Sequence, residues 1–171
     1  MKKISYSLFA ALALAVSVPA YAQETNVIAY PTVDEASFII EVPDDWEMTA
    51  AEEVGEYFHL DGPTGAVFSF RTIEGSEDAL QEAIEGSLED VSSLFSEIEL
   101  GDAEDWTPDG LTGFYAVGSG KDKDGTDVRI GLAWCALNDG KIAQMWFVTD
   151  LDDAPGIKAA ELIANSLASP K

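Results

Sequence analysis

His59 is the chain's only histidine and its best candidate for acid–base chemistry, because imidazole titrates near neutral pH. A Ser–His–Asp triad needs no closeness in sequence, so His59 could belong to one. Acidic pairs at Asp44–Asp45, Glu52–Glu53 and Asp152–Asp153 could instead supply the acid and base of a glycosidase. However, no Gly-x-Ser-x-Gly motif designates a nucleophile, and adjacent acids arise by chance among 32 acidic residues. A small periplasmic hydrolase using carboxylates or His59 is therefore an alternative rather than the leading function.

Asp122, Asp124 and Asp127 alternate around Gly125, a pattern that can wrap a hard cation such as calcium. The run is not an EF-hand loop, because Asp127 occupies the glycine position and Ala133 the closing glutamate position. Two neighbouring lysines also weaken the local negative field. The pattern favours a solvated hairpin turn, and a calcium-stabilised binding module remains a second alternative.

Gly118-Ser119-Gly120-Lys121 is similar to the end of a phosphate-binding loop. The complete motif needs glycine where Tyr115 stands and serine or threonine where Asp122 stands. The motif fails, and the run is interpreted as a strand end. No catalytic, cofactor-binding or metal-binding residue is assigned from the sequence.

Four tryptophans and one cysteine are the remaining side chains of interest. Trp134 and Trp146 fall in predicted central strands and are expected in the core, whereas Trp46 and Trp106 fall at loop junctions. These two are the better candidates for a binding surface, although core packing is favoured for them as well. Cys135 lies in an apolar strand-like run, which is typical of a buried, unreactive thiol.

Charge excludes some functions. The chain has 9 basic and 32 acidic residues, and removal of Lys2 and Lys3 with a signal peptide leaves 7 against 32, a net charge of −25. Such a chain repels nucleic acid and anionic membrane surfaces. The acidity indicates a cationic partner, bound divalent ions, or adaptation to a salty habitat.

The N-terminus has the pattern of a secretory signal peptide. Lys2 and Lys3 precede an apolar run over 8–18, and Ala20-Tyr21-Ala22 gives the small-x-small site, so cleavage is expected before Gln23. The apolar run is shorter than the roughly 20 residues that span a bilayer. We therefore expect residues 1–22 to be removed and the protein to be periplasmic or secreted, without a stable membrane anchor.

The elements that must position these side chains follow from periodicity and turn residues. Residues 23–35 are an extended polar lead-in, and 36–168 form a single globular domain. Ser76 caps a long helix whose apolar stripe extends to Ile98, and Gly86 inside it indicates close packing. The other expected elements are a strand at 38–42, a hairpin of 57–60 with 66–73, three strands at 111–118, 126–137 and 141–149, and a helix starting near 153–155.

The expected fold class is α+β, with a mostly antiparallel central sheet. Even-numbered residues of 128–134 are large and apolar, while Gly131, Ala133 and Cys135 on the other face are small and apolar. Apolar residues on both faces indicate a sheet covered on both sides, as in an α/β/α sandwich.

The chain resembles the PsbP-like superfamily, which includes the PsbP subunit of photosystem II, Ran-binding Mog proteins and bacterial DcrB-like proteins. The resemblance rests on Phe38-x-Ile40-x-x-Pro43-x-x-Trp46 and on Leu111-Thr112-Gly113 at a strand start, and covers about residues 36–168. It implies the fold, and members that are mostly accessory or binding proteins. The leading interpretation is an exported, monomeric, non-enzymatic envelope protein that engages a small ligand or a protein partner, including a basic one, through its acidic surface.

Overall fold

The computed structural model describes residues 24–49 and 56–170. The expected signal peptide, its cleavage point before Gln23 and the pair Glu52–Glu53 lie outside the described residues. No helix among the described residues is long and apolar enough to cross a membrane.

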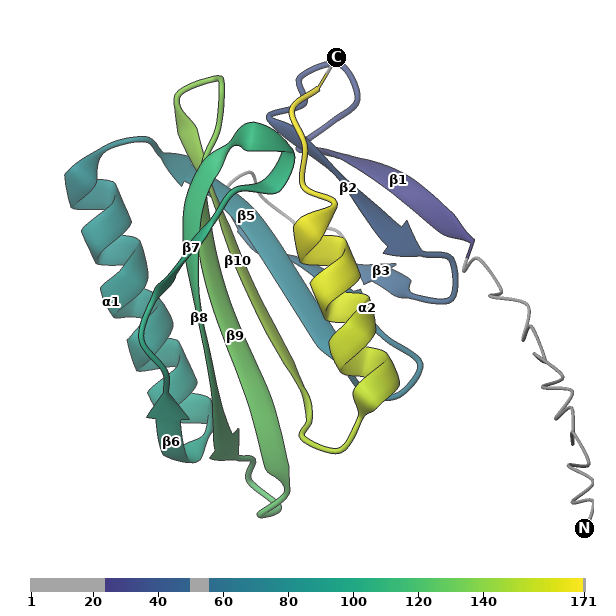
Figure 1. Ribbon diagram of the computed structural model, residues 1–171, viewed down its shortest axis with the longest axis vertical. Helices are drawn as coiled ribbons and strands as arrows, with labels where there is room; N and C mark the ends of the chain where they lie inside the picture. Colours follow the sequence, from purple (N-terminus) through teal and green to yellow (C-terminus); the bar gives the residue numbers. More distant parts are fainter. Residues whose placement is uncertain (1–23, 50–55, 171) are drawn as a thin grey trace, which may run out of the picture.

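An eight-stranded, entirely antiparallel sheet forms the centre of the molecule (Figure 1). Its order is β3-β4-β5-β10-β9-β8-β6, and β7 pairs with the same edge of β8 as β6 does. The three long strands joined by Asx-Gly turns were predicted, and the turns have glycine at positive φ. The strands are β3 (Glu47–Thr49), β4 (Phe58–Asp61), β5 (Val67–Glu74), β6 (Ser96–Leu100), β7 (Glu104–Trp106), β8 (Thr112–Lys121), β9 (Asp127–Ala136) and β10 (Lys141–Asp150).

Helix α1 (Glu77–Leu94) packs on one face of this sheet. The Ser76 hydroxyl accepts a hydrogen bond from the Ala79 N–H, so the predicted cap is confirmed. Beneath α1, Val91 belongs to a buried cluster with Ile130, Leu132 and Trp134 of β9. These are the large residues that the sequence placed on one face of the strand.

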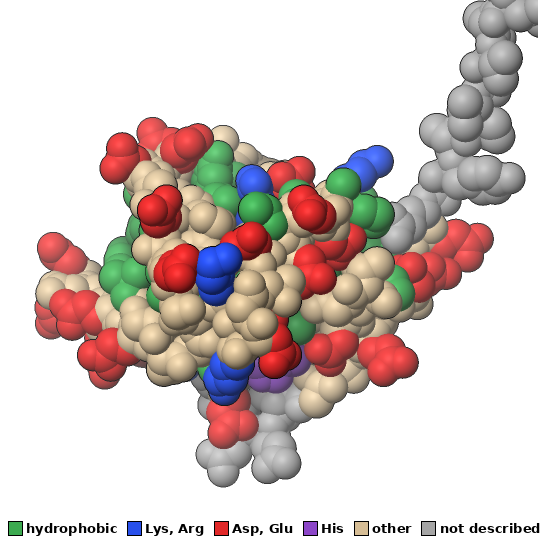
Figure 2. Space-filling view, turned by 90° about the horizontal axis from the view of Figure 1, so that it is seen from below, with side chains coloured by type: hydrophobic (Ala, Val, Ile, Leu, Met, Phe, Trp, Pro, Cys, Tyr) green, Lys and Arg blue, Asp and Glu red, His purple; other side chains and the backbone are tan. Residues whose placement is uncertain are grey.

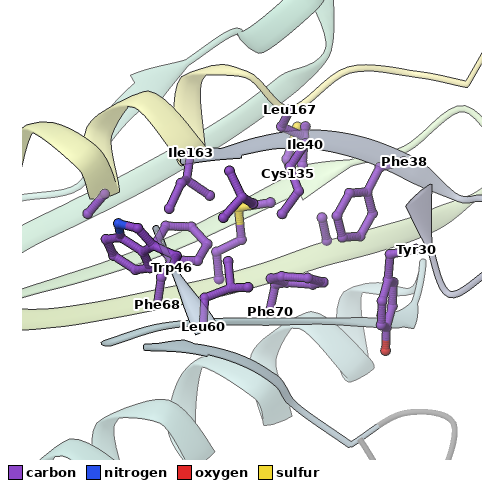
Figure 3. Packing of buried hydrophobic residues seen from close by; sticks show 14 of the residues in the cluster. Tyr30, Phe38, Ile40, Trp46, Leu60, Phe68, Phe70, Cys135, Ile163 and Leu167 are labelled. Atoms are coloured by element: carbon purple, nitrogen blue, oxygen red, sulfur yellow. The ribbon is translucent and has the colours of Figure 1, made fainter. Parts of the chain in front are cut away.

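Helix α2 (Ala154–Asn165) packs on the opposite face, beside a small antiparallel sheet of β1 (Thr25–Tyr30) and β2 (Phe38–Pro43). Ile39 and Ala168 exchange two backbone hydrogen bonds, which tie β2 to the chain after α2. Figure 3 shows the core on this side, where Phe38, Phe70 and Ile163 are fully buried. Each such side chain stabilises the fold by about 1.5–3 kcal/mol.

Three details differ from the sequence-based expectations. The long helix ends at Leu94, and Ile98 lies in β6, because Phe95 already has extended backbone. A methyl group at Gly86 would contact nothing within 4 Å, so the expected close packing there is wrong. The expected lead-in contains β1, whose Tyr30 is buried in the core.

The prediction of an α+β fold with a mostly antiparallel sheet and two helices is confirmed. The simple α/β/α sandwich is not confirmed, because β1 and β2 share the second face with α2. That face is covered unevenly: α2 contacts β10 and β2, and the surface of β8 and β9 beyond it is left open to a cleft.

Candidate functional site

An open cleft of about 660 Å³ lies between α2 on one side and β7 and β8 on the other. Pairing register places Tyr115, Ala133 and Met145 in one row across β8, β9 and β10. Val117, Gly131 and Phe147 form the next row, and both rows line the cleft. A cleft of this size is in the range of ordinary ligand sites.

Gly131 leaves room for an aromatic ring on this floor. A side chain at this position would collide with the ring of Phe147. The glycine therefore gives the cleft its depth at β9, and the ring forms an apolar surface beside it. This is the physical use of the small residues that the sequence shows on this face.

Arg129 is the basic residue of the cleft floor. Its Nε is buried and has no hydrogen-bond partner, and neither of the two ion pairs found among the described residues involves it. A buried donor without an acceptor is costly, and because this Nε is buried, a ligand in the cleft would meet the rest of the guanidinium. Sequence reasoning missed Arg129; the available signal was an arginine between Val128 and Ile130, in a largely apolar strand of a strongly acidic chain.

Acidic residues surround the cleft. Asp105 and Asp109 come from β7 and the following turn, Glu161 comes from α2, and all three are exposed. The wall contains Trp106, whose Nε1 donates to Asn165 Oδ1 over 3.1 Å, linking β7 to α2. Of the two tryptophans proposed as binding candidates, Trp106 lines this cleft.

Tyr115 lies between the floor and the acidic rim. Its hydroxyl donates to Glu104 Oε2 over 2.8 Å, and this hydrogen bond raises the pKa of Tyr115. The phenol therefore stays protonated at neutral pH and acts as a donor. The cleft can thus offer one guanidinium, aromatic faces and several carboxylates to a ligand.

On the opposite face, a buried polar network joins α1 to the sheet. Arg71 Nε donates to Gln144 Oε1 over 2.8 Å, and Gln144 Nε2 donates to Ser87 Oγ over 2.7 Å. The Tyr57 ring covers the Arg71 guanidinium at 4.5 Å. The hydrogen-bonding groups of this network pair with one another, so we interpret its role as holding α1 on the sheet.

His59 lies in β4, and its Nδ1 is 2.8 Å from Ser69 Oγ of β5. Ser69 is fully buried, however, so its hydroxyl cannot be reached by a substrate. A nucleophile must be accessible, and this geometry therefore does not support a triad centred on His59. In the acidic pair Asp152–Asp153, Asp153 is engaged as the N-cap of α2, where its Oδ1 accepts from the Gly156 N–H.

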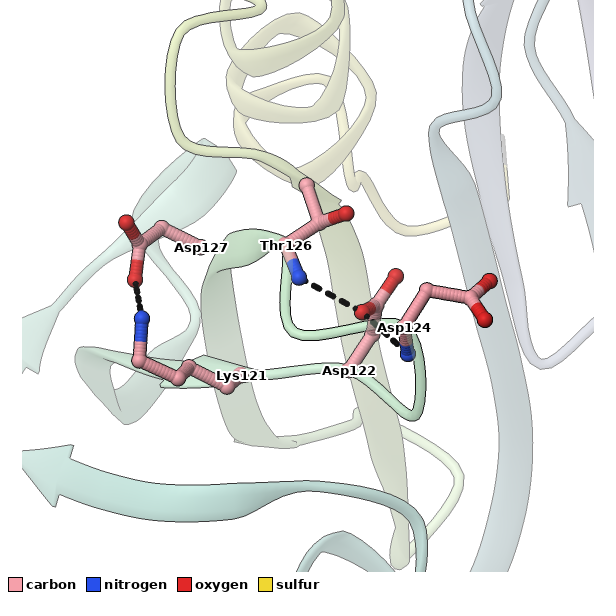
Figure 4. A network of polar contacts seen from close by, with 5 residues as sticks. All are labelled: Lys121, Asp122, Asp124, Thr126 and Asp127. Atoms are coloured by element: carbon pink, nitrogen blue, oxygen red, sulfur yellow. Dashed lines mark hydrogen bonds and ion pairs between the residues drawn. The ribbon is translucent and has the colours of Figure 1, made fainter.

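The three aspartates considered for calcium do not converge (Figure 4). Asp122 Oδ1 accepts from the N–H groups of Asp124 and Thr126, which shapes the β8–β9 turn. Asp127 instead pairs with Lys121 at 2.6 Å. No group of three His, Cys, Asp or Glu side chains among the described residues could hold a metal ion. The arrangement does not favour the calcium-stabilised alternative.

The other residues noted in the sequence are structural. Gly118-Ser119-Gly120-Lys121 continues β8, which extends past the predicted end at 118. Trp46 is buried in the core, the placement favoured for it, and also lines a second pocket beside the start of α2, whereas Trp134 is buried as predicted. Trp146 is half-buried on β10. Cys135 is also buried, and burial raises the pKa of its thiol to about 11, so it stays a thiol at neutral pH.

Acidic side chains are spread over the face of the molecule seen in Figure 2. Figure 2 shows them scattered across one whole face with few basic side chains among them. The total charge therefore does not single out a docking face. The cleft is the candidate site, because acidic and aromatic side chains and Arg129 line one concave surface there.

Comparisons with known proteins show the fold. A scan of protein-family models and a search of curated proteins find no match. Cyanobacterial PsbP (CyanoP) from Synechocystis sp. PCC 6803 is similar, with TM-score 0.60 and 14% identity, over 92% of this chain and 99% of that chain. The Ran-binding protein Mog1p of Saccharomyces cerevisiae follows with TM-score 0.57 and 12% identity, over 86% and 96%.

A third structure, from Bacteroides thetaiotaomicron, gives TM-score 0.52 and 18% identity over 78% of this chain, which spans 45% of that protein's length. The resemblance to the PsbP-like superfamily is therefore confirmed at the level of the fold. At these identities the likeness carries no site residue over to this chain.

Proposed function

We propose that the protein is an exported, non-enzymatic accessory protein of the bacterial envelope that binds a partner protein with basic side chains. The observation that carries this proposal is the acidic rim of the α2–β7 cleft. Exposed carboxylates around a concave, partly aromatic surface attract cationic groups and speed their association. In the same fold, Mog1p is named as a Ran-binding protein, which supports a binding role for this scaffold.

The binding face is tested by paired charge variants. Asp105→Asn with Glu161→Gln removes two rim charges, and Glu82→Gln with Glu89→Gln removes two exposed charges from α1. Residues 23–171 carrying a C-terminal tag would be crosslinked in the native envelope fraction at low and high salt. We expect a dominant basic partner that is captured by the α1 control but lost with the rim variant.

Salt and variant results together decide the outcome. Capture should weaken at high salt, because mobile ions screen exposed charges beyond about 8–10 Å. Equal capture by both variants would remove the cleft from the proposal. Capture that is indifferent to salt would contradict recognition through the acidic rim.

Export is tested separately. N-terminal sequencing of the protein recovered from the periplasm or medium should begin at Gln23. Recovery of the chain only in the cytoplasm with Met1 retained would contradict the proposed location.

A further inference from the structure

Arg129 differs from three other basic residues, each of which has a polar partner within the protein. Lys121 and Lys141 pair with aspartates, and Arg71 donates to Gln144 beneath Tyr57. Arg129 has neither kind of partner, although acidic residues outnumber basic ones more than threefold in the chain. Arg129 lines the cleft and forms no ion pair among the described residues, so the part of its guanidinium beyond the buried Nε is available to an external acceptor.

The chemistry of that acceptor follows from the guanidinium and its neighbours. The planar fork of arginine matches a carboxylate with two parallel hydrogen bonds. Val117, Gly131 and Phe147 line the floor with it, and an apolar wall strengthens a charge-assisted bond. A phosphate dianion is disfavoured, because Asp105, Asp109 and Glu161 would repel its second charge.

The same three carboxylates require positive charge elsewhere on the occupant. A ligand with one carboxylate and one or more cationic groups can pair with Arg129 on the floor and with the carboxylates of the rim. The cleft, at about 660 Å³, is larger than a single amino acid needs and is open at its mouth. A short chain segment that enters from outside fits this space.

We propose that the cleft receives the C-terminal end of its partner, with the terminal carboxylate on Arg129 and basic side chains on Asp105, Asp109 and Glu161. This inference rests on the proposed function and specifies which part of the partner binds. Trp106 and Phe147 supply apolar contact surface for the side chains between the two charged ends.

The test uses peptides that differ only at the C-terminus. Immobilised residues 23–171 would be exposed to a mixture of pentapeptides with lysine at the second and fourth positions and random residues elsewhere. One half of the mixture has free carboxylates and the other half has C-terminal amides. The best retained sequence would then be synthesised in both forms, labelled at its N-terminus, and titrated by fluorescence anisotropy.

We expect the free acid to bind about tenfold or more tightly than its amide, as loss of a charge-assisted bond implies. Arg129→Gln should abolish this difference, and Arg129→Lys should retain only part of it, because lysine lacks the fork. Lys123→Gln, an equal charge change outside the cleft, should leave both affinities unchanged. Thermal unfolding of each variant checks that it is folded.

Failure of this inference and failure of the proposed function look different. If acid and amide bind alike and both depend on Asp105 and Glu161, the acidic rim binds a partner but Arg129 does not capture a chain end. If neither half of the mixture is retained, or if folded Arg129→Gln keeps the preference for the acid, the inference is wrong.

Discussion

The ring of Phe147 on β10 lies directly over Gly131 on β9, so closely that a methyl group on the glycine would overlap it. This contact forms part of the cleft floor and couples the two strands through one aromatic side chain. The first prediction tests this contact by changing Gly131 and then Phe147.

Gly131→Ala should lower the free energy of unfolding by about 1–3 kcal/mol, the usual cost of overpacking a fitted site. Urea denaturation monitored by circular dichroism measures it. Adding Phe147→Leu should relieve the overlap, so the double variant should be more stable than the sum of the single effects implies. Strict additivity would show that the overlap is relieved without moving Phe147.

Gly86→Ala should act in the opposite direction. A methyl group at this α1 position meets nothing within 4 Å, and glycine in a helix interior costs about 0.5–1 kcal/mol relative to alanine. We therefore expect the free energy of unfolding to rise by up to about 1 kcal/mol in the same urea experiment. A loss of stability would mean that the glycine is needed for packing after all.

Gln144→Leu should be among the more damaging core substitutions. It removes the acceptor of Arg71 Nε and the donor to Ser87 Oγ, leaving polar groups unpaired beneath α1. The expected loss is about 1–3 kcal/mol. Ser87→Ala should cost less, and a double-mutant cycle should show that the two losses are not additive. Independent effects would contradict a coupled network.

Asp153 gives a prediction for acid stability. Burial raises the pKa of this carboxyl, but hydrogen bonds from Thr64, the Gly156 N–H and Thr149 outweigh burial and hold the pKa below its ordinary 3.8. A folded-state pKa below the unfolded one stabilises the protein above pH 3.8, and the contribution is lost as pH falls through the folded value.

Asp153→Asn should therefore reduce stability at pH 7, by a few tenths to about 1 kcal/mol for a partly exposed helix-terminal charge, and the difference from wild type should shrink towards pH 2.5. Chemical denaturation at both pH values measures it. Asp152→Asn at the neighbouring exposed position is the control, since no hydrogen bond to the Asp152 side chain is found within residues 24–49 and 56–170. A constant penalty at both pH values would assign the effect to packing rather than charge.

Local elements could be predicted where neighbouring residues decide them. Ser76 and Asp153 identify helix starts through hydrogen bonds made within three residues, and the Asx-Gly turns fix the long hairpins. The end of α1 could not be predicted, because Leu94, Phe95 and Ile98 continue a helical spacing. Ile98 lies instead in β6, because the chain after Phe95 pairs with the edge strand β8, which is distant in sequence.

The sequence by itself determined the charge, the apolar character of both faces of β9, the α+β class and the pairing of neighbouring strands. Those properties depend on residue types and on contacts between nearby positions. Only the tertiary structure decided that Arg129, Trp106 and Glu161 share one cleft, because β9, β7 and α2 meet there through long-range packing. It also decided that Asp122 and Asp127 point to different partners, since turn geometry directs each carboxylate separately.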